Sequence, residues 1–477
     1  MSAVADMCVD LVVIGGGPGG YTAALRGAQA GLKTILINGD ELGGCCLNYG
    51  CIPSKAFIHS AKLYRQIESS KQFGVMVDGV SLDFSRVQTW KNRVMRRLQR
   101  GLQTLLDGVG VQIVNGTATL TGAETLSVNE SQGGLVKIMF AHAVIAVGSR
   151  PRRLTDFKNS AASVVDTDSA FSIDQVPEDV IVVGGGAAGL EWAWLMNAFG
   201  ARVTVIETMP RIASYLDIDI SEGLRNSLIK QGIRVVIDAT VEFVEEKNGR
   251  AKVSVGVGEG EAELLVADLI IGAVGRKAAT QGLGLEMVAV KVDDDGGIIV
   301  KDDMSTSVAH IYAVGDCVSG SGLAHQAMAQ AEVAVAGIRG EVTDTSSLIV
   351  PTCIFTQPEA VCVGLTEEEA QSQGMSVVEG RFPFRASGRA AISDETDGFV
   401  KLIANEEDGR LVGVHILSSV ASELVGEATL ALRSNMTLNQ YARVVRQHPT
   451  FTEALGEAAW DALGHPLHIP GSSTLPH

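Results

Sequence analysis

The sequence has few of the features that mark nucleic-acid-binding, membrane or secreted proteins. The formal net charge of the 477 residues is −17, so the chain has no basic excess with which to hold nucleic acid. No apolar run reaches the roughly 20 residues that a membrane-spanning helix needs. The N-terminal residues contain no basic flank, apolar signal core or arginine-rich leader. We therefore expect a cytoplasmic protein that binds neither nucleic acid nor membrane.

Cysteine and aromatic residues are also scarce. The seven cysteines stand at positions 8, 45, 46, 51, 317, 353 and 362. Outside 45–51 they are scattered, which excludes the disulfide framework of a small secreted domain. Aromatic residues make up only 5% of the chain, whereas hydrophobic residues make up 46% and glycine contributes 54 residues. This composition is typical of α/β domains with tight βα turns, and the length predicts about three domains.

Cys46 and Cys51 can form a disulfide only if the chain bends between them. Residues five apart in a regular helix have Cα atoms roughly 8–9 Å apart, whereas a disulfide needs about 4.4–6.8 Å. A bonded pair therefore requires a break between Leu47 and Gly50, and Gly50 is the residue that best permits it. Pro53 suits the first turn of a following helix. The two cysteines alone leave a chance pair of buried thiols open.

A glycine loop lies near the N-terminus. An apolar run at 11–14 is followed by Gly15-x-Gly17-x-x-Gly20 and an alanine-rich stretch at 21–30, which predicts a strand, a turn and a helix. The spacing permits a tight turn and close approach of the backbone to a pyrophosphate, with the helix N-terminus offering free N–H groups. The loop therefore predicts a dinucleotide site.

The acidic residue that normally binds the ribose of such a dinucleotide is missing. Its position, after a strand predicted at 34–37, is occupied by Asn38. Either Asn38 makes a weaker neutral hydrogen bond, or Asp40 takes the place of the carboxylate.

A second glycine loop follows the apolar run at 180–183. Gly184-x-Gly186-x-x-Gly189 precedes a helical stretch and a strand that ends at Glu207. A carboxylate at that point accepts hydrogen bonds from a free 2′-hydroxyl and repels a 2′-phosphate, so we expect NAD rather than NADP. Two dinucleotide sites in one chain imply a flavin and a nicotinamide, because electrons must pass between them.

The run from His448 to Glu453, His-Pro-Thr-Phe-Thr-Glu, is a second chemical motif. A histidine can take a proton from a thiol and return it near neutral pH. A carboxylate five residues on can fix the tautomer of the ring and stabilise the imidazolium. A lone histidine is more often structural, and it is the combination with a dithiol that favours catalysis.

Together these stretches resemble the class I flavoprotein pyridine-nucleotide disulfide oxidoreductases, from residue 11 to about 469. The Ile-Pro-Ser-Lys run that ends at Lys55 is most similar to the branch that oxidises dihydrolipoyl groups. The resemblance implies an α/β fold with two Rossmann-like dinucleotide-binding domains, for FAD and NAD, plus an α+β C-terminal dimerisation domain. The implied segments are 1–150 (FAD, with the redox disulfide), 151–276 (NAD), 277–346 (FAD, second segment) and 347–477 (dimerisation).

The same resemblance implies the catalytic residues. Cys46 and Cys51 are expected to form the redox disulfide, with Cys46 as the interchange thiol and Cys51 next to the flavin. Lys55 is expected to pair with Glu191 beside the flavin. From the residues alone, Glu191 could equally be an ordinary surface residue of a helix.

In the family the histidine motif acts on the disulfide of the other subunit, so an obligate homodimer with His448 and Glu453 acting in trans is implied. His325 either contacts the flavin or has a structural place at a helix start. The implied FAD contacts are Gly15, Gly17, Gly20, Asn38, Gly44, Lys55, Gly148, Asp316 and Ala324. The implied NAD contacts are Gly184, Gly186, Gly189, Glu207 and Gly275.

The chain departs from the family pattern at several positions. Cys45 and Val147 each stand where threonine is usual, and we expect Cys45 to fill the volume of that threonine. Ala187 and Ala188 replace bulky residues that gate the nicotinamide pocket, so the gate is open or supplied by something else.

The expected activity is FAD-dependent oxidation of dihydrolipoyl groups with reduction of NAD, in a complex of the 2-oxoacid dehydrogenase or glycine-cleavage type. The expected partners are lipoyl-bearing carrier domains and an acyltransferase core, and no metal is expected because no cluster has metal-ligand spacing. One alternative is an NAD(P)H-dependent reductase of another small disulfide, such as glutathione or mycothiol; Glu207 argues against its NADPH-linked members. Another is a structural homologue that has lost flavin binding. A mercury reductase would need a C-terminal vicinal cysteine pair, which 472–477 lacks.

An amphipathic helix is predicted at 82–106 from apolar residues at helical spacing, namely Val87, Trp90, Val94, Leu98, Leu102 and Leu105. Its remaining surface is basic, with Arg86, Lys91, Arg93, Arg96, Arg97 and Arg100. This surface is either a solvated face or a docking patch for an acidic partner. The Pro/Gly/Ser-rich tail after 469 is expected to fray.

Overall fold

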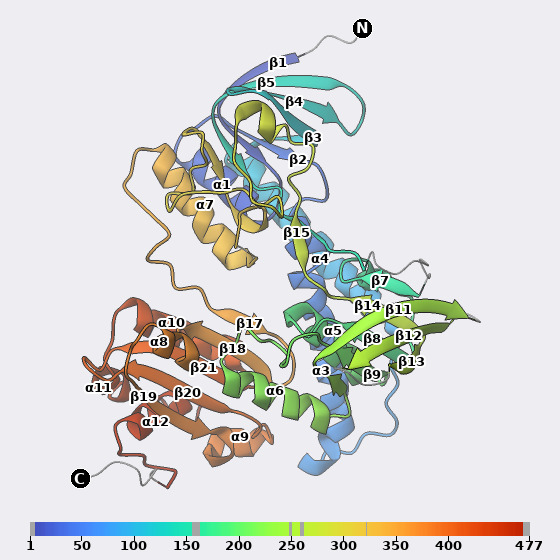
Figure 1. The fold of residues 1–477 in the computed structure, drawn as a ribbon, viewed down its shortest axis with the longest axis vertical. Helices are drawn as coiled ribbons and strands as arrows, with labels where there is room; N and C mark the ends of the chain where they lie inside the picture. Colours follow the sequence, from blue (N-terminus) through green and yellow to red (C-terminus); the bar gives the residue numbers. More distant parts are fainter. Residues whose placement is uncertain (1–4, 155–162, 248–249, 258–261, 321, 471–477) are drawn as a thin grey trace.

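The computed structural model describes residues 5–154, 163–247, 250–257, 262–320 and 322–470 (Figure 1). The first sheet lies at one end of the molecule, and the second and third sheets lie side by side at the other (Figure 1). The predicted frayed tail falls almost entirely outside the described residues. None of the helices in the described ranges combines the length and the apolar character needed to cross a bilayer.

The first sheet carries the first glycine loop. Its parallel part runs in the order β16 (Ile311–Ala313), β5 (Leu135–Ile145), β1 (Ala5–Ile14), β2 (Thr34–Asn38) and β3 (Gln112–Gly122). An antiparallel return through β4 (Thr125–Glu130) joins β3 to β5. The central strands are buried on both faces, which is why their sequences are continuously apolar. Helices α1 (Pro18–Gln29) and α7 (Ala324–Ile338) pack on one face through their alanines.

The second sheet carries the second glycine loop. It is wholly parallel, in the order β10 (Arg234–Val236), β9 (Arg202–Ile206), β8 (Asp179–Val183), β14 (Leu269–Gly272) and β7 (Val164–Asp166). Helices α5 (Ala187–Ala198) and α6 (Ile218–Lys230) share a core with it. A small antiparallel sheet of β11 (Ala239–Lys247), β12 (Arg250–Val257) and β13 (Glu263–Ala267) covers its other face.

The chain crosses between these two sheets through one antiparallel pair of strands. β6 (Ser149–Pro151) leads out of the first sheet and β15 (Arg276–Ala278) leads back to it, with Arg276 opposite Pro151. The expected segment ends at 150 and 276 both fall in this pair.

The third sheet is antiparallel, in the order β17 (Thr352–Ile354), β18 (Glu359–Gly364), β21 (Leu411–Ser418), β20 (Phe399–Asn405) and β19 (Val377–Pro383). Helix α10 (Ala421–Arg433) packs on β18 and β21, and α12 (Glu453–Ala462) packs on β19 and β20. Shorter helices are α8 (Glu367–Ser372), α9 (Gly388–Ser393) and α11 (Leu438–Ala442). Short 3₁₀ helices lie at Ser70–Phe73, Ser169–Ser172, Leu285–Val288, Gly315–Cys317 and Phe384–Ala386.

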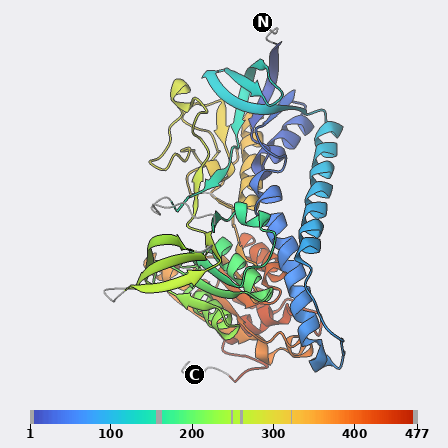
Figure 2. The same cartoon turned by 90° about the vertical axis from the view of Figure 1, so that its right-hand side faces the viewer.

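Three helices follow the first βαβ unit and connect the two ends of the molecule. They are α2 (Gly44–Asn48), α3 (Cys51–Ser69) and α4 (Phe84–Gly108), and Figure 2 shows α3 and α4 along one side. Phe57 of α3 lies 5.7 Å from Phe84 of α4 and 6.3 Å from Trp192 of α5, measured between ring centroids. This shared aromatic core ties the segment that carries the cysteine pair to the second sheet.

The helix predicted at 82–106 is present as α4, and its apolar face was predicted only in part, because Leu102 is buried and Val87 packs on a core whereas Leu98 and Leu105 are exposed. Asp83 caps the helix by accepting a hydrogen bond from the backbone N–H of Arg86. Lys91, expected on the solvated side, is only 6% exposed and donates to the carbonyl of Phe171 at 2.8 Å. Trp90 is instead 44% exposed. A lysine can bury its methylene stem when its amine finds a partner, so charge alone does not mark the outer face.

Candidate active site

The cysteine pair lies at a break between two helices. Cys46 is in α2, Cys51 is the first residue of α3, and Tyr49 and Gly50 separate the helices. The two cysteines form a disulfide with their Cα atoms 4.6 Å apart. The break that the sequence required for a bonded pair is therefore confirmed. Pro53 lies in the first turn of α3, as predicted.

The disulfide opens onto one large cavity of about 2540 Å³. The wall brings together several segments that are distant in sequence. The predicted site residues in it are Gly15, Gly17, Asn38, Gly44, Cys46, Cys51, Lys55, Gly148, Glu191, Asp316 and Ala324. His325 is also in the wall, and its Nε2 is 2.8 Å from the carbonyl of Pro351.

The first glycine loop has the geometry of a phosphate cradle. Gly15 has φ = +112°, and a Cβ atom there would lie 2.2 Å from the carbonyl oxygen of Ala146. A Cβ on Gly20 would lie 1.8 Å from the carbonyl oxygen of Gly15, and one on Gly44 would lie 2.6 Å from the Cα of Gly17. No side chain caps the N-terminus of α1, so its backbone N–H groups are available for a phosphate. The loop fits the pyrophosphate of a dinucleotide such as FAD.

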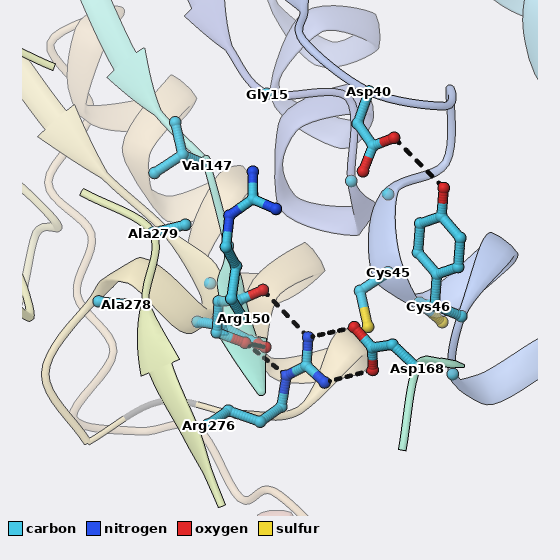
Figure 3. Close-up of a pocket in the computed structure, with 18 of the residues that line it drawn as sticks. Gly15, Asp40, Cys45, Cys46, Val147, Arg150, Asp168, Arg276, Ala278 and Ala279 are labelled. Atoms are coloured by element: carbon cyan, nitrogen blue, oxygen red, sulfur yellow. Dashed lines mark hydrogen bonds and ion pairs between the residues drawn. The ribbon is translucent and has the colours of Figure 1, made fainter. Parts of the chain in front are cut away.

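Both candidates for the ribose contact lie in the cavity wall. Asn38 is buried, and its side-chain amide donates to the backbone carbonyl of Asp40. Asp40 is exposed and accepts a hydrogen bond from the hydroxyl of Tyr49 at 3.3 Å (Figure 3). Burial and the Asp40 carboxylate raise the pKa of Tyr49 to about 12, so the phenol stays a donor. The carboxylate of Asp40, which the Tyr49 hydroxyl holds in place, is therefore two residues from the position where an acidic residue usually binds the ribose.

An ionic network lines the opposite wall of the cavity. Asp316 accepts a hydrogen bond from the hydroxyl of Ser149 at 2.7 Å, and Arg276 donates to the same hydroxyl at 2.8 Å. Arg276 also pairs with Asp168 at 2.7 Å (Figure 3). Only Asp316 was among the predicted site residues. The position of Arg276 directly after Gly275, at the start of the crossover strand β15, is the sequence signal that could have identified it.

Lys55 and Glu191 form an ion pair beside the disulfide. The Nζ atom of Lys55 lies 2.9 Å from the carboxylate of Glu191, which is only 8% exposed and so is not a surface residue. The same carboxylate accepts hydrogen bonds from the hydroxyl of Ser54 at 2.7 Å and the backbone N–H of Phe355 at 3.1 Å. Cys51 and Lys55 are one helical turn apart on α3, so the ammonium group lies on the same side of the helix as the thiol.

The second glycine loop repeats the geometry of the first. Gly184 also has φ = +112°, and a Cβ on it would lie 2.3 Å from the carbonyl oxygen of Ala273. A Cβ on Gly189 would lie 2.0 Å from the carbonyl oxygen of Gly184, and Gly186 caps α5 without a side chain. The carboxylate of Glu207 accepts hydrogen bonds from the N–H groups of Gly185 at 2.5 Å and Met209 at 2.7 Å. This loop fits a second dinucleotide whose ribose meets a carboxylate.

The two loops differ in their relation to the large cavity. Gly184, Gly189 and Glu207 lie outside its wall, whereas Ala187 and Ala188 belong to it. The first two residues of α5 thus contribute only small side chains to this wall. Gly275, with φ = +96°, allows the chain to turn into β15 at the same edge.

His448 and Glu453 lie together in the part of the chain that contains the third sheet. Nδ1 of His448 hydrogen bonds to Oε1 of Glu453 at 2.9 Å, and the other carboxylate oxygen accepts the N–H of Thr450 at 2.8 Å. Burial alone would raise the pKa of Glu453, but these two hydrogen bonds outweigh it and lower the pKa. The imidazole of His448 is 80% exposed and lies outside the wall of the cavity that holds the disulfide. Within one chain the two chemical groups do not meet.

Cys45 lies in the same cavity wall as the disulfide, next to the Arg276–Asp168 pair (Figure 3). Burial raises the pKa of its thiol to about 12; the guanidinium of Arg276 opposes this and the carboxylate of Asp168 adds to it. Its thiol is therefore neutral at physiological pH. A neutral thiol agrees with the expectation that Cys45 only fills the volume of a threonine.

Within the described ranges, one group of carboxylates is spaced closely enough to hold a metal ion, namely Asp219, Glu367 and Glu379. The ammonium group of the fully buried Lys401 already lies among them, 2.7 Å from Asp219 and 3.0 Å from Glu367. These residues therefore form an internal ion network and not a metal site.

Comparison with known proteins gives consistent relatives along the whole chain. The family described as pyridine nucleotide-disulphide oxidoreductase matches residues 9–331, and the dimerisation domain of that family matches 350–459. A protein named dihydrolipoyl dehydrogenase from Geobacillus stearothermophilus is 37% identical over 468 residues, covering 98% of this chain and 99% of the relative. One of the same name from Bacillus subtilis is 38% identical over 472 residues, covering 96% and 99%.

Solved structures share the fold. LpdA from Mycobacterium tuberculosis superposes with a TM-score of 0.87 at 25% identity, covering 94% of this chain and 99% of that one. The flavoprotein disulfide reductase RclA from Escherichia coli superposes with a TM-score of 0.85 at 24% identity, covering 94% and 99%. On this sequence match and shared architecture, the chain belongs to the pyridine nucleotide-disulphide oxidoreductase family.

Proposed function

We propose that the protein oxidises dihydrolipoyl groups to the lipoyl disulfide and reduces NAD. The observation that carries this proposal is the Cys46–Cys51 disulfide, which opens onto the same cavity as the first glycine loop and the Lys55–Glu191 ion pair. The relatives named dihydrolipoyl dehydrogenase, which match almost the whole chain, support the choice of substrate.

The chain uses FAD and NAD, the cofactors of its family. We assign FAD to the first glycine loop, with Gly15, Gly17, Gly20, Asn38, Gly44, Lys55, Gly148, Asp316 and Ala324 as contacts. We assign NAD to the second, with Gly184, Gly186, Gly189, Glu207 and Gly275. When bound, FAD supplies a two-electron acceptor beside the reduced cysteines and NAD supplies the final hydride acceptor.

The first chemical step is thiol–disulfide exchange. The chain is a homodimer through its dimerisation domain, and we assign the base to His448 of the partner subunit, because His448 lies outside the disulfide-bearing cavity of its own chain. The imidazole takes a proton from one substrate thiol while Glu453 holds its other nitrogen. The substrate thiolate attacks Sγ of Cys46, so that a substrate–Cys46 disulfide forms and the Cys46–Cys51 bond breaks.

Cys51 leaves as a thiolate. It is the first residue of the 19-residue helix α3, and Lys55 is one turn further on, so the helix N-terminus and the ammonium group both stabilise the negative charge. The histidine releases its first proton to solvent and takes the proton of the second substrate thiol, whose thiolate attacks the substrate sulfur of the mixed disulfide. The oxidised substrate leaves, and Cys46 departs as a thiolate that receives the second proton from the histidine. Substrate is oxidised by two electrons and the enzyme disulfide is reduced by two.

The test is NAD reduction by the FAD-loaded dimer with dihydrolipoamide, compared with reduced glutathione, mycothiol and dithiothreitol at equal thiol concentration. We expect dihydrolipoamide to give the highest kcat/KM, and Glu207 predicts that NADP is a poor acceptor. A higher kcat/KM with another dithiol would replace the substrate assignment. A purified protein that stays colourless after incubation with FAD would favour the non-catalytic alternative.

We further propose that the dimer serves as the dehydrogenase component of a 2-oxoacid dehydrogenase or glycine-cleavage type complex, with lipoyl-bearing carrier domains and the acyltransferase core as partners. For the domains we propose the segments 1–150, 151–276, 277–346 and 347–477. A cytoplasmic location is supported by the five cysteines outside the pair, which are free thiols.

A further inference from the structure

One face of α4 carries a row of arginines that points away from the core. Arg93, Arg96, Arg97 and Arg100 are exposed and follow the spacing i, i+3, i+4, i+7, so they lie on one side of the helix. The buried residues of α4 lie on the other side. In Figure 2, α4 stands at the edge of the molecule, beside α3.

These arginines have no ionic partner within the described part of the chain. Among the described residues, no carboxylate forms an ion pair with any of the four, and their only side-chain hydrogen bonds are those of Arg96 and Arg100 to backbone carbonyls of α4 itself. The sequence contains no acidic residue from 84 to 106, although the whole chain is strongly acidic at −17. Like charges at i and i+4, as in Arg93–Arg97 and Arg96–Arg100, destabilise a helix. The row therefore destabilises the helix, and no ion pair with another described residue offsets this cost.

An aromatic side chain lies at the edge of this row. Trp90 is 44% exposed and precedes Arg97 by two helical turns. Tryptophan and arginine are the residue types most enriched among the contacts that dominate binding energy at protein interfaces. A solvated charged helix face gains nothing from an exposed tryptophan, so the combination favours contact with another molecule.

The helix that carries the row packs against the segment that carries the redox disulfide. Gln99, between Arg97 and Arg100, donates from its side-chain amide to Oδ1 of Asn48 at 2.7 Å. Asn48 is the last residue of α2, the helix that contains Cys46. A molecule held on the arginine row thus contacts the helix that packs against the segment containing Cys46.

We propose that the arginine row of α4, with Trp90 at its edge, is the docking surface for an acidic carrier protein that presents its dithiol arm to the Cys46–Cys51 disulfide. The inference rests on the proposed function and adds where the carrier docks and that the carrier is negatively charged around its dithiol arm. Opposite charge on the two surfaces accelerates encounter and fixes orientation, and both effects weaken as salt rises.

The probes are three short peptides, each with one dihydrolipoyl-lysine, flanked by glutamates, by glutamines or by lysines. With the wild-type FAD-loaded dimer at low ionic strength, we expect kcat/KM for the glutamate peptide to exceed that for the glutamine peptide about tenfold. The double variant Arg96→Glu with Arg97→Glu should lose this preference, while kcat/KM for free dihydrolipoamide stays within about twofold of wild type. The milder Arg93→Gln with Arg100→Gln should reduce the preference by an intermediate factor.

The matched control reverses two charges elsewhere, with Lys137→Glu on β5 and Lys291→Glu after the 3₁₀ helix at Leu285–Val288; both lysines are exposed. It changes the net charge equally and should keep the peptide preference. Equal kcat/KM for all three peptides in the wild type, or a preference that survives in the arginine variants, would overturn the docking surface alone. So would loss of the dimer in the arginine variants by size-exclusion chromatography, because the row would then be an interface between copies. Failure of the wild type to oxidise free dihydrolipoamide would remove the proposed function itself.

Discussion

Lys55 and Glu191 stand 136 positions apart in the sequence, on α3 and α5, yet Nζ of the lysine lies 2.9 Å from the carboxylate of the glutamate. Each belongs to a segment with a separate task, since α3 begins with Cys51 of the redox pair and α5 follows the second glycine loop. The phenyl ring of Phe355 lies 4.2 Å from the same Nζ, and the backbone N–H of Phe355 donates to the same carboxylate. The pair therefore joins the disulfide, the nicotinamide side and the third sheet at one point.

Replacing Glu191 with glutamine should impair both activity and stability. The change leaves a half-buried ammonium group without its counter-ion next to the dithiol, so the field that favours the Cys51 thiolate is altered. We expect kcat to fall at least about tenfold and the free energy of unfolding to fall by roughly 1–3 kcal/mol. Steady-state kinetics with dihydrolipoamide and urea denaturation measure the two effects.

A second ion pair on α3 supplies the control. Lys62 pairs with the buried Glu359 at 2.8 Å, two turns further from the disulfide than Lys55. Glu359→Gln should lower stability by a similar amount while kcat changes by less than about twofold. Equal losses of kcat in the two variants would show that the Lys55–Glu191 pair acts only through stability.

The two cysteines should differ in their relation to the flavin. In the reduced, FAD-loaded enzyme we expect a long-wavelength absorption band that arises from contact of the Cys51 thiolate with the flavin. Cys51→Ser should abolish this band, whereas Cys46→Ser should retain it, because only Cys51 starts α3 and faces Lys55. Both variants should lose turnover with dihydrolipoamide. A band that survives in Cys51→Ser would reverse the assignment of the two sulfurs.

Much of the fold could be predicted because it depends on short-range geometry. Gly15 and Gly184 share φ = +112°, a backbone conformation that side chains other than glycine rarely adopt, so the loops are visible in the sequence. The break at Gly50 follows from the reach of a disulfide. The buried strands β1, β2 and β8 were recognisable from their apolar runs, although β1 extends well beyond the run at 11–14.

The parts that could not be predicted depend on contacts between distant segments. The network of Arg276, Asp168 and Ser149 joins residues more than 100 positions apart, as its hydrogen bonds show. Nothing local in the sequence marks Asp168 as a partner. Lys91 was placed on the wrong face because its buried partner is a backbone carbonyl, that of Phe171, which leaves no signature in the side-chain pattern.

Cys45 should be chemically silent although it neighbours the redox pair. With its pKa raised to about 12 by burial, only about 10⁻⁵ of the thiol is ionised at pH 7. After reduction, iodoacetamide should therefore modify Cys46 and Cys51 at pH 7 and leave Cys45 unmodified, as mass spectrometry of tryptic peptides can show. The exposed Cys8 serves as the positive control. Modification of Cys45 should accelerate about tenfold per pH unit in alkaline buffer, and Cys45→Thr should leave turnover unchanged.

The kcat of the enzyme should depend on the negative charge of Glu453, which pairs with His448. The carboxylate stabilises the imidazolium that forms when His448 takes the substrate proton, so Glu453→Gln should lower kcat by about 10–10²-fold. His448→Gln should lower it further, because the proton acceptor itself is lost. Equal kcat in Glu453→Gln and the wild type would show that the hydrogen bond at 2.9 Å has no part in proton transfer.

The carboxylate of Glu453 should also make the free energy of unfolding depend on pH. The folded state lowers the pKa of Glu453 below its ordinary value of 4.5, after burial is outweighed by the hydrogen bonds from Thr450 and His448. Folding therefore favours the carboxylate, so its contribution is present above about pH 4.5 and is lost as the pH falls through the lowered folded pKa. We expect less than about 1 kcal/mol, because the side chain is a third exposed and solvent screens the charge. Urea denaturation of the wild type and Glu453→Gln at about pH 6 and pH 3.5 should show a difference that shrinks on acidification; a difference that grows instead would contradict the direction of the shift.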